Sequence, residues 1–157
     1  MVPGKDWRAS NPPVGWICIY EDQLRAGLRF PLHPFIRALF HSYQILITQI
    51  VPNGIRLVIK FLLICREHGV EPTIDLFWFC FKIRKAAQAP GYKTFKARNK
   101  LKIQTPDNNS GWRNKYMYAQ VPEMDIREDW NYAPFSDPRP SVSFPPIGYE
   151  ILGCLPE

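Results

Sequence analysis

The chemistry that this sequence offers most clearly is anion binding by a basic segment rich in aromatic residues. Residues 82–115 contain ten lysines and arginines and one acidic residue, Asp107. Basic side chains attract phosphates and exposed aromatic rings stack on bases, so this composition is typical of surfaces that bind single-stranded nucleic acid. The residues predicted to form such a surface are Lys82, Arg84, Lys85, Tyr92, Lys93, Lys96, Arg98, Lys100, Lys102, Trp112, Arg113 and Lys115.

A structural interpretation explains the same residues without a ligand. Side chains alternate along a strand, so a sheet that covers helices turns its aromatics inward and its lysines to water. Lys82, Arg84 and Lys85 also follow an apolar helical segment, where cations complement the negative end of the helix dipole. Both interpretations stay open at this stage, and the direction in which the rings point distinguishes them.

Motifs of common catalytic sites are missing from the sequence. It has no Asp-Thr/Ser-Gly loop for a pair of carboxylates, no glycine-rich phosphate loop and no Gly-x-Ser-x-Gly turn. The acidic residues before residue 82 are few and mostly stand where helices are expected to begin, a position that the helix dipole explains. We therefore expect a protein that is not an enzyme, with no cofactor and no small-molecule substrate.

The cysteines give no metal site. Cys18, Cys65, Cys80 and Cys154 lack the short spacings of zinc ligands, and Cys65 with His68 supplies only two donors. The apolar surroundings of Cys65 and Cys80 predict buried thiols. The N-terminus has no apolar signal region, and no run approaches the ~18 apolar residues of a membrane span. We expect an intracellular protein, cytoplasmic or nuclear, that is not secreted and does not bind membranes.

One helix, at about residues 54–68, is predicted to form the centre of the fold. Its surface is apolar except for a thin stripe of Arg56, Lys60 and Glu67, so other elements must cover most of it. Asn53 is a good N-cap for this helix. Gly69 suits the left-handed position after its end, with Val70 folding back.

Shorter elements are expected on both sides of this helix. Residues 14–20 read as a strand or an extended segment, and residues 21–26 as one or two helical turns with Leu24 inward. A helix from Pro34 to about Tyr43 presents an apolar stripe of Phe35, Ala38, Leu39 and Ser42. Residues 45–51 are apolar and predict a short helix or a packed connector.

After the central helix, Thr73 is a suitable N-cap for a helix over residues 74–82. Residues 92–97 and 115–121 have the aromatic and β-branched content of strands, residues 106–111 form a turn, and residues 101–103 are a candidate third strand. The predicted fold class is α+β and mainly α: a small helical bundle around the central helix, with a small antiparallel sheet at about 92–121.

The expected domain organisation follows from composition. Residues 1–13 are a proline-containing leader, and residues 14–121 form one globular domain with a helical part (14–85) and a basic β part (86–121). Residues 122–157 form an acidic, proline-rich tail with irregular structure. An acidic tail after a basic block is a candidate internal competitor for it.

Several strings resemble the gypsy-type transposon domain of plants, which occurs in reading frames of retroelement origin. The resemblance begins in the run from Ile19 to Phe35, and its most specific part is the string Ala-Gly-Leu-Arg-Phe-Pro-Leu-His-Pro-Phe at residues 26–35. It continues through Cys-Arg-Glu-His-Gly-Val-Glu-Pro-Thr at residues 65–73 and Gly-Trp-Arg-Asn-Lys-Tyr at residues 111–116. It covers residues 14–121, implies a retrotransposon origin, and brings no catalytic residue with it.

Three hypotheses about function follow. The first is a non-enzymatic, retroelement-derived domain, gag-like or capsid-like, that self-associates or binds RNA or DNA without sequence preference. The second is a sequence-specific DNA-binding module of a transposase-like protein, which requires a recognition helix with exposed base-reading side chains. The third is a structural remnant that retains only a stable fold.

Overall fold

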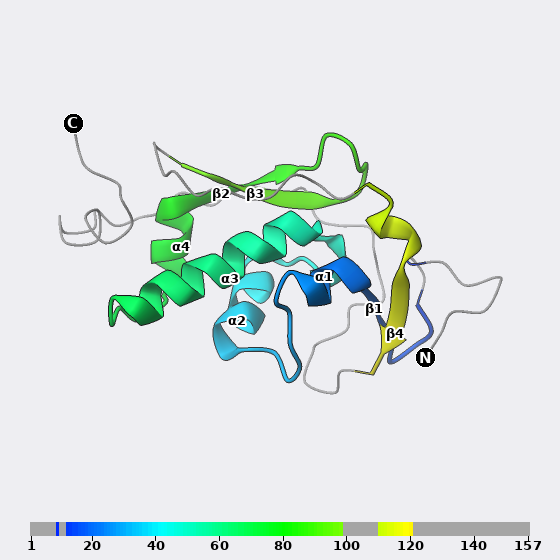
Figure 1. Ribbon diagram of the computed structural model, residues 1–157, viewed down its shortest axis with the longest axis horizontal. Coiled ribbons are helices and arrows are strands. Elements are labelled where there is room, and N and C mark those ends of the chain that lie inside the picture. The colour runs from blue at the N-terminus through cyan, green and yellow to red at the C-terminus, as the bar shows by residue number, and fades with distance from the viewer. Residues whose placement is uncertain (1–8, 10–11, 99–109, 121–157) are drawn as a thin grey trace.

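The computed structural model describes Ala9, residues 12–98 and residues 110–120. Its elements follow one another along the chain as β1 (Ile17–Tyr20), α1 (Glu21–Arg25), α2 (Pro34–Tyr43), η1 (a 3-10 turn, Ile47–Gln49), α3 (Pro52–Glu67), α4 (Ile74–Cys80), β2 (Phe81–Lys85), β3 (Lys93–Ala97), η2 (a 3-10 turn, Trp112–Asn114) and β4 (Tyr116–Ala119). The predicted fold class is confirmed, since helices surround α3 and two small antiparallel sheets accompany them (Figure 1).

Helix α3 crosses the middle of the molecule, with the β2–β3 hairpin on one side and α2 on the other (Figure 1). Phe61 of α3 is fully buried, and its ring lies 5.4 Å from that of Phe35 and 5.2 Å from that of Phe77, measured between centroids. These rings join α2, α3 and α4 in one core. Arg56 and Lys60 are partly exposed and Glu67 is exposed, so the predicted polar stripe is the solvated edge of this helix.

The two ends of α3 differ in how well the sequence predicted them. The predicted cap at Asn53 is wrong: the N-cap is Val51, and the helix begins at Pro52, two residues before the predicted start at residue 54. The fixed φ of proline suits this first helical position. Asn53 instead accepts a hydrogen bond from the Arg56 guanidinium. The predicted C-terminal motif is confirmed, because Gly69 has φ +64° and the Val70 N–H donates to the Cys65 carbonyl at 2.8 Å.

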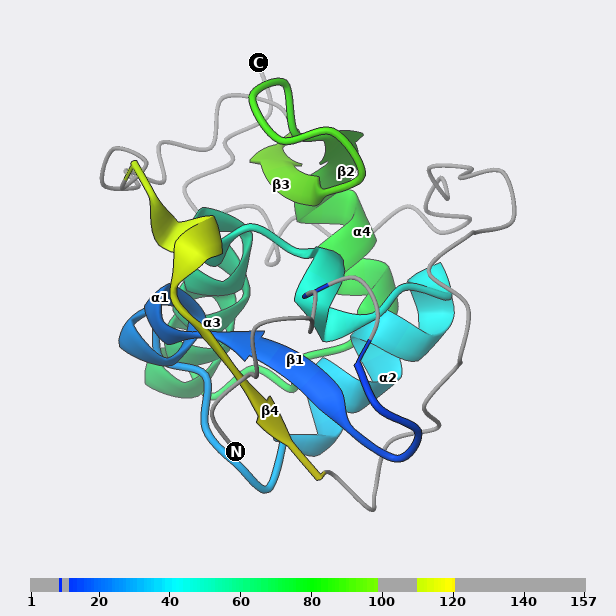
Figure 2. The same ribbon diagram turned by 90° about the vertical axis from the view of Figure 1, so that its right-hand side faces the viewer.

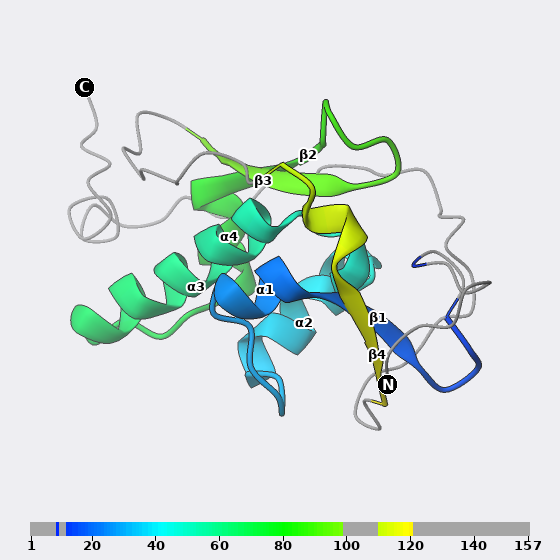
Figure 3. The ribbon, with the colours of Figure 1, turned by 45° about the vertical axis from the view of Figure 1, so that its right-hand side comes forward.

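The strands pair differently from the single sheet predicted over residues 92–121. β3 pairs with β2, and β4 pairs with β1, so there are two separate sheets (Figures 2 and 3). The predicted helix over 74–82 has its cap, since the Thr73 hydroxyl accepts from the Leu76 N–H, but it ends at Cys80. Phe81 is extended, and Phe81–Lys85 continues as a strand because its apolar and basic residues alternate with a period of two.

Two details of the N-terminal half also differ from prediction. Helix α2 has the predicted bounds, but its buried face comprises Phe35, Ile36, Leu39, Phe40 and Tyr43, while Ala38 and Ser42 are exposed. In α1, Leu24 is partly exposed and its neighbours Asp22 and Gln23 are buried.

Some predictions concern residues outside the described part of the chain. These are most of the leader 1–13, the candidate strand at 101–103, the side chains of Lys100 and Lys102, and the tail 122–157. Within the described residues, no helix is long and apolar enough to cross a membrane.

Candidate nucleic-acid interface

The β2–β3 hairpin separates its apolar and basic side chains onto two faces. In the register, Ile83 stands opposite Phe95, Lys82 opposite Lys96, and Arg84 opposite Thr94. Directly opposite residues of an antiparallel pair share a face. Ile83 and Phe95 are buried in the main core, whereas Arg84 and Lys96 are exposed and Lys82 is partly exposed. The outer face therefore presents three cations and one threonine.

No carboxylate of the described residues forms an ion pair with Lys82, Arg84 or Lys96. Lys82 and Lys96 stand directly opposite each other in the strand pair. Like charges in such positions repel each other and destabilise the pair. A second opposed pair, Lys85 and Lys93, ends the hairpin. The pKa of Lys93 is lowered by burial and, to a smaller extent, by the charge of Lys85. Lys85 and Lys93 have the same position in the strand alternation as Ile83 and Phe95, so the outer face itself carries three cations, Lys82, Arg84 and Lys96. A bound anion would stabilise this face.

Arg98 has a structural contact in this fold. Its Nε donates to the carbonyls of Trp78 at 2.8 Å and Phe81 at 3.1 Å, and its backbone N–H donates to Cys80 at 2.7 Å. These are carbonyls at the C-terminal end of α4, where a cation also complements the helix dipole. Arg98 therefore fixes the junction between α4 and β2.

The predicted aromatic residues lie in a separate cluster beside β1. Tyr92 and Trp112 are partly buried and pack on Tyr20, with ring centroids 5.0 Å apart for Tyr92 and Trp112 and 4.7 Å apart for Tyr20 and Trp112. The Tyr20 and Tyr92 hydroxyls hydrogen-bond to each other. Burial raises the pKa of both phenols. These rings contact one another rather than lining the outer face of the hairpin. The structural interpretation of the sequence expects aromatics that face the helices, and Phe95, which packs on Phe77 of α4, does so, whereas Tyr92 and Trp112 pack beside β1.

Arg113 and Lys115 are exposed beside the same hairpin. Arg113 and Trp112 line a hollow of about 420 Å³ whose other wall is the β2–β3 loop, from Ala86 to Ala89, with Thr94. Lys115 follows η2, and its carbonyl accepts from the Glu21 N–H at 2.9 Å. Of the predicted site residues that the structure describes, the fold gathers Lys82, Arg84, Lys85, Lys93 and Lys96 on the hairpin, with Arg113 next to its loop.

Sequence analysis missed the pairing that creates this basic face. The signal was present in Phe-Lys-Ile-Arg-Lys at residues 81–85, whose strict alternation is that of a half-buried strand. This strand follows directly on the apolar helix α4, so the change from a helical period to a period of two at residue 81 is hard to recognise. Among the described residues, no group of three or more His, Cys, Asp or Glu side chains lies close enough to hold a metal ion. Cys65 and Cys80 are buried free thiols, as predicted.

Comparison with known proteins supports the family resemblance. Residues 17–85 match the family model described as "Putative gypsy type transposon", a segment that runs from β1 to the end of β2. The chain is also 28% identical, over 156 residues and 92% of its length, to Meiosis-specific protein ASY2 of Arabidopsis thaliana. It spans only 11% of that protein's length. No solved structure matches the chain.

Proposed function

We propose that this chain is a non-enzymatic domain of retroelement origin that binds the phosphate backbone of nucleic acid through the outer face of the β2–β3 hairpin. The observation that carries the proposal is the register that places Lys82, Arg84 and Lys96 together on one face, with no carboxylate of the described residues paired to them. The match to a gypsy-type transposon family supports the origin, and the plant relative supports a plant source.

Binding of this kind carries little sequence preference. Phosphate contacts position a protein on nucleic acid, whereas base contacts supply specificity. The described aromatic rings near the hairpin are engaged with one another, and the described helices bury their apolar faces in the core. Neither feature favours base stacking or a recognition helix. Buried free thiols agree with a reducing, intracellular setting, in the cytoplasm or the nucleus.

The electrostatic origin of the proposed binding gives it a measurable salt dependence. Each phosphate neutralised on a single strand contributes about −0.7 to the slope of log K against log salt concentration. Engagement of the three cations on the outer face contributes about −2 to this slope.

The test is a fluorescence-anisotropy titration of a labelled 20-nucleotide single strand with the full chain, at several salt concentrations. In the variant Lys82→Gln/Arg84→Gln/Lys96→Gln, we expect at least tenfold weaker binding at low salt and a slope reduced by about 2. The matched control, Arg25→Gln/Arg37→Gln/Arg66→Gln, removes the same charge from α1, α2 and α3. Equal weakening in both variants would show that net charge rather than the hairpin governs binding, and no binding at low salt would end the proposal.

A further inference from the structure

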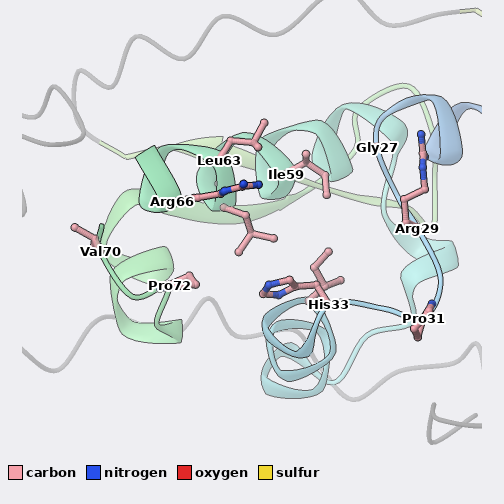
Figure 4. A pocket seen from close by; sticks show the side chains of 11 residues that line it. Gly27, Arg29, Pro31, His33, Ile59, Leu63, Arg66, Val70 and Pro72 are labelled. Carbon is pink, nitrogen blue, oxygen red and sulfur yellow. The ribbon is translucent and has the colours of Figure 1, made fainter. Parts of the chain in front are cut away.

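An apolar groove lies between α2 and the C-terminal half of α3 (Figure 4). Helix α2 and the β2–β3 hairpin lie on opposite sides of α3 (Figure 1). It encloses about 540 Å³. Its walls come from three parts of the chain: the loop after α1 with the start of α2, the face of α3 that carries Ile59, Leu62 and Leu63, and the segment from Val70 to Pro72 after α3.

Apolar side chains in and next to the groove are exposed to solvent. Leu63 is 50% exposed, although the other apolar side chains of α3 are buried or partly buried. Phe30, next to the lining residue Pro31, is 37% exposed. Removing apolar surface from water is favourable, so an exposed leucine in a concave wall is a favourable contact point for another apolar side chain.

Every charged or titratable side chain that lines the groove is a hydrogen-bond donor. These are Arg29, His33 and Arg66, and no aspartate or glutamate lines it. Figure 4 shows Arg66 lying along α3 above the groove, His33 projecting from the start of α2, and Arg29 at the opposite end from Val70. Glu67 and Glu71 lie close by in the sequence but outside the lining. The groove thus offers an apolar floor with positive groups around it.

Two of these donors are already held in position. Nη1 of Arg29 donates to the carbonyls of Leu24 at 2.6 Å and Leu28 at 2.7 Å, which leaves Nε and Nη2 for a ligand. Nδ1 of His33 accepts from the Phe35 N–H at 3.2 Å, so a proton on the neutral ring resides on Nε2. Carbonyl contacts do not neutralise the Arg29 charge, and Arg66 forms no ion pair with the described residues.

We propose that this groove binds a short acidic peptide segment of a partner protein, one that inserts two bulky apolar side chains and places carboxylates on the surrounding cations. The apolar floor around Leu62 and Leu63 fits the first requirement, and the complementary charge of Arg29 and Arg66 fits the second. Bidentate pairing of arginine with carboxylate gives the orientation. This proposal is independent of nucleic-acid binding by the hairpin.

The experiment is a selection of random 12-residue peptides displayed on phage against the full chain, followed by anisotropy titration of the selected peptides. We expect enriched peptides to be acidic and to carry two large apolar residues three or four positions apart. Leu63→Asp, a change at an exposed position, should weaken their binding at least tenfold, and Arg66→Glu at least fivefold. The control Lys82→Gln, on the hairpin, should leave their affinity unchanged.

Other outcomes would overturn the proposal. Enrichment of basic or uncharged peptides, or of peptides that bind Leu63→Asp as well as the parent chain, would contradict an acidic occupant of this groove. Concentration-dependent self-association abolished by Leu63→Asp would identify a second copy of the chain as the occupant. Displacement of the selected peptides by a peptide of residues 121–132 would identify the chain's own acidic segment instead.

Discussion

At the scale of single residues, Gln23 connects three segments through one buried amide. Its Oε1 accepts from the Tyr20 N–H at 3.1 Å, and its Nε2 donates to the carbonyls of Ile47 and Ile50, both at 2.8 Å. The side chain is fully buried. It thereby joins the end of β1 and helix α1 to the connector around η1. The Ile47 carbonyl also accepts from the Ile50 N–H at 3.2 Å, so the Tyr20 N–H and the Ile50 carbonyl are the groups that depend most on Gln23.

Replacing Gln23 with methionine tests this role. Gln23→Met keeps the length of the side chain but removes the Gln23 bonds to the Tyr20 N–H and the Ile50 carbonyl, so we expect the free energy of unfolding to fall by about 2–4 kcal/mol. Urea denaturation followed by circular dichroism measures the change. The control Gln88→Met, at an exposed position, should change the free energy of unfolding by less than about 0.5 kcal/mol. Similar effects of the two substitutions would contradict the proposed role.

The sequence could not have predicted Gln23 as a core residue. A short helical pattern favours Leu24 as the inward side chain, because apolar side chains are normally those that are buried. The carbonyls that satisfy Gln23 belong to residues 24 and 27 positions further along the chain. The sequence pattern around residue 23 cannot predict hydrogen-bond partners at that separation. Val70 and Thr73 were predictable because their capping partners lie within a few residues.

The buried thiol of Cys65 couples stability to alkaline pH. Burial raises the pKa of Cys65 from 9.0 to about 11. Above pH 9 the unfolded chain loses this proton while the folded chain keeps it, so stability falls as pH rises from about 9 to about 11. We expect urea denaturation under reducing conditions to show a drop between pH 8 and pH 10 that is smaller in Cys65→Ala by about 1 kcal/mol. Parallel curves for the two proteins would refute this.

At the scale of elements, the hairpin depends on a close approach between α3 and β3. A Cβ at Gly54 would lie 2.6 Å from Cγ2 of Ile50 and 3.6 Å from the ring of Phe95. Ile50 is fully buried and cannot move away easily. Gly54 therefore lets α3 pack against the hairpin at the point where the connector also passes.

Replacing Gly54 with alanine should destabilise the chain even though alanine has the higher helix propensity. Alanine gains about 1 kcal/mol over glycine inside a helix, but overpacking a core costs about 1–3 kcal/mol, so we expect Gly54→Ala to destabilise the chain. In an Ile50→Ala background the obstructing methyl group is gone, and Gly54→Ala should become neutral or stabilising. Thermal denaturation of the four proteins in this double-mutant cycle measures the coupling. Additive effects would argue against direct contact.

Elements with a strong period were predictable from sequence, and their partners were not. α2 and most of α3 follow from apolar spacing and local caps. The strands at 92–97 and 115–121 were recognised by composition, but β2 was not, because the apolar run before it reads as one continuous helix. Each strand pairs with the strand that covers the same part of the core. Phe95 of β3 and Ile83 of β2 are buried in the main core, and Tyr118 of β4 and Cys18 of β1 are buried in the aromatic cluster.

At the scale of the whole molecule, the hairpin that carries the basic face and helix α2 beside the groove lie on opposite sides of α3 (Figure 1). One surface is basic, and the other is apolar and concave. The excess of cations in residues 82–115 predicted the first. The groove could not be predicted, because its walls come from segments around residues 27–36, 59–66 and 70–72 that only the fold brings together.

This separation predicts that the two binding activities are independent. The groove variant Leu63→Asp should bind the labelled single strand with unchanged affinity and salt slope. The hairpin variant Lys82→Gln/Arg84→Gln/Lys96→Gln should bind the selected acidic peptides as tightly as the parent chain. Anisotropy titrations with each probe, repeated at saturation with the other, check this. A change of more than about threefold in either cross-titration would reveal coupling between the surfaces.

The pairing of β1 with β4 brings two distant parts of the sequence to one place. Ile17 stands opposite Ala119, so the described body starts and finishes at neighbouring points (Figure 2). A body with adjoining termini can be spliced into a surface loop of a longer protein without forcing the host's flanking residues apart.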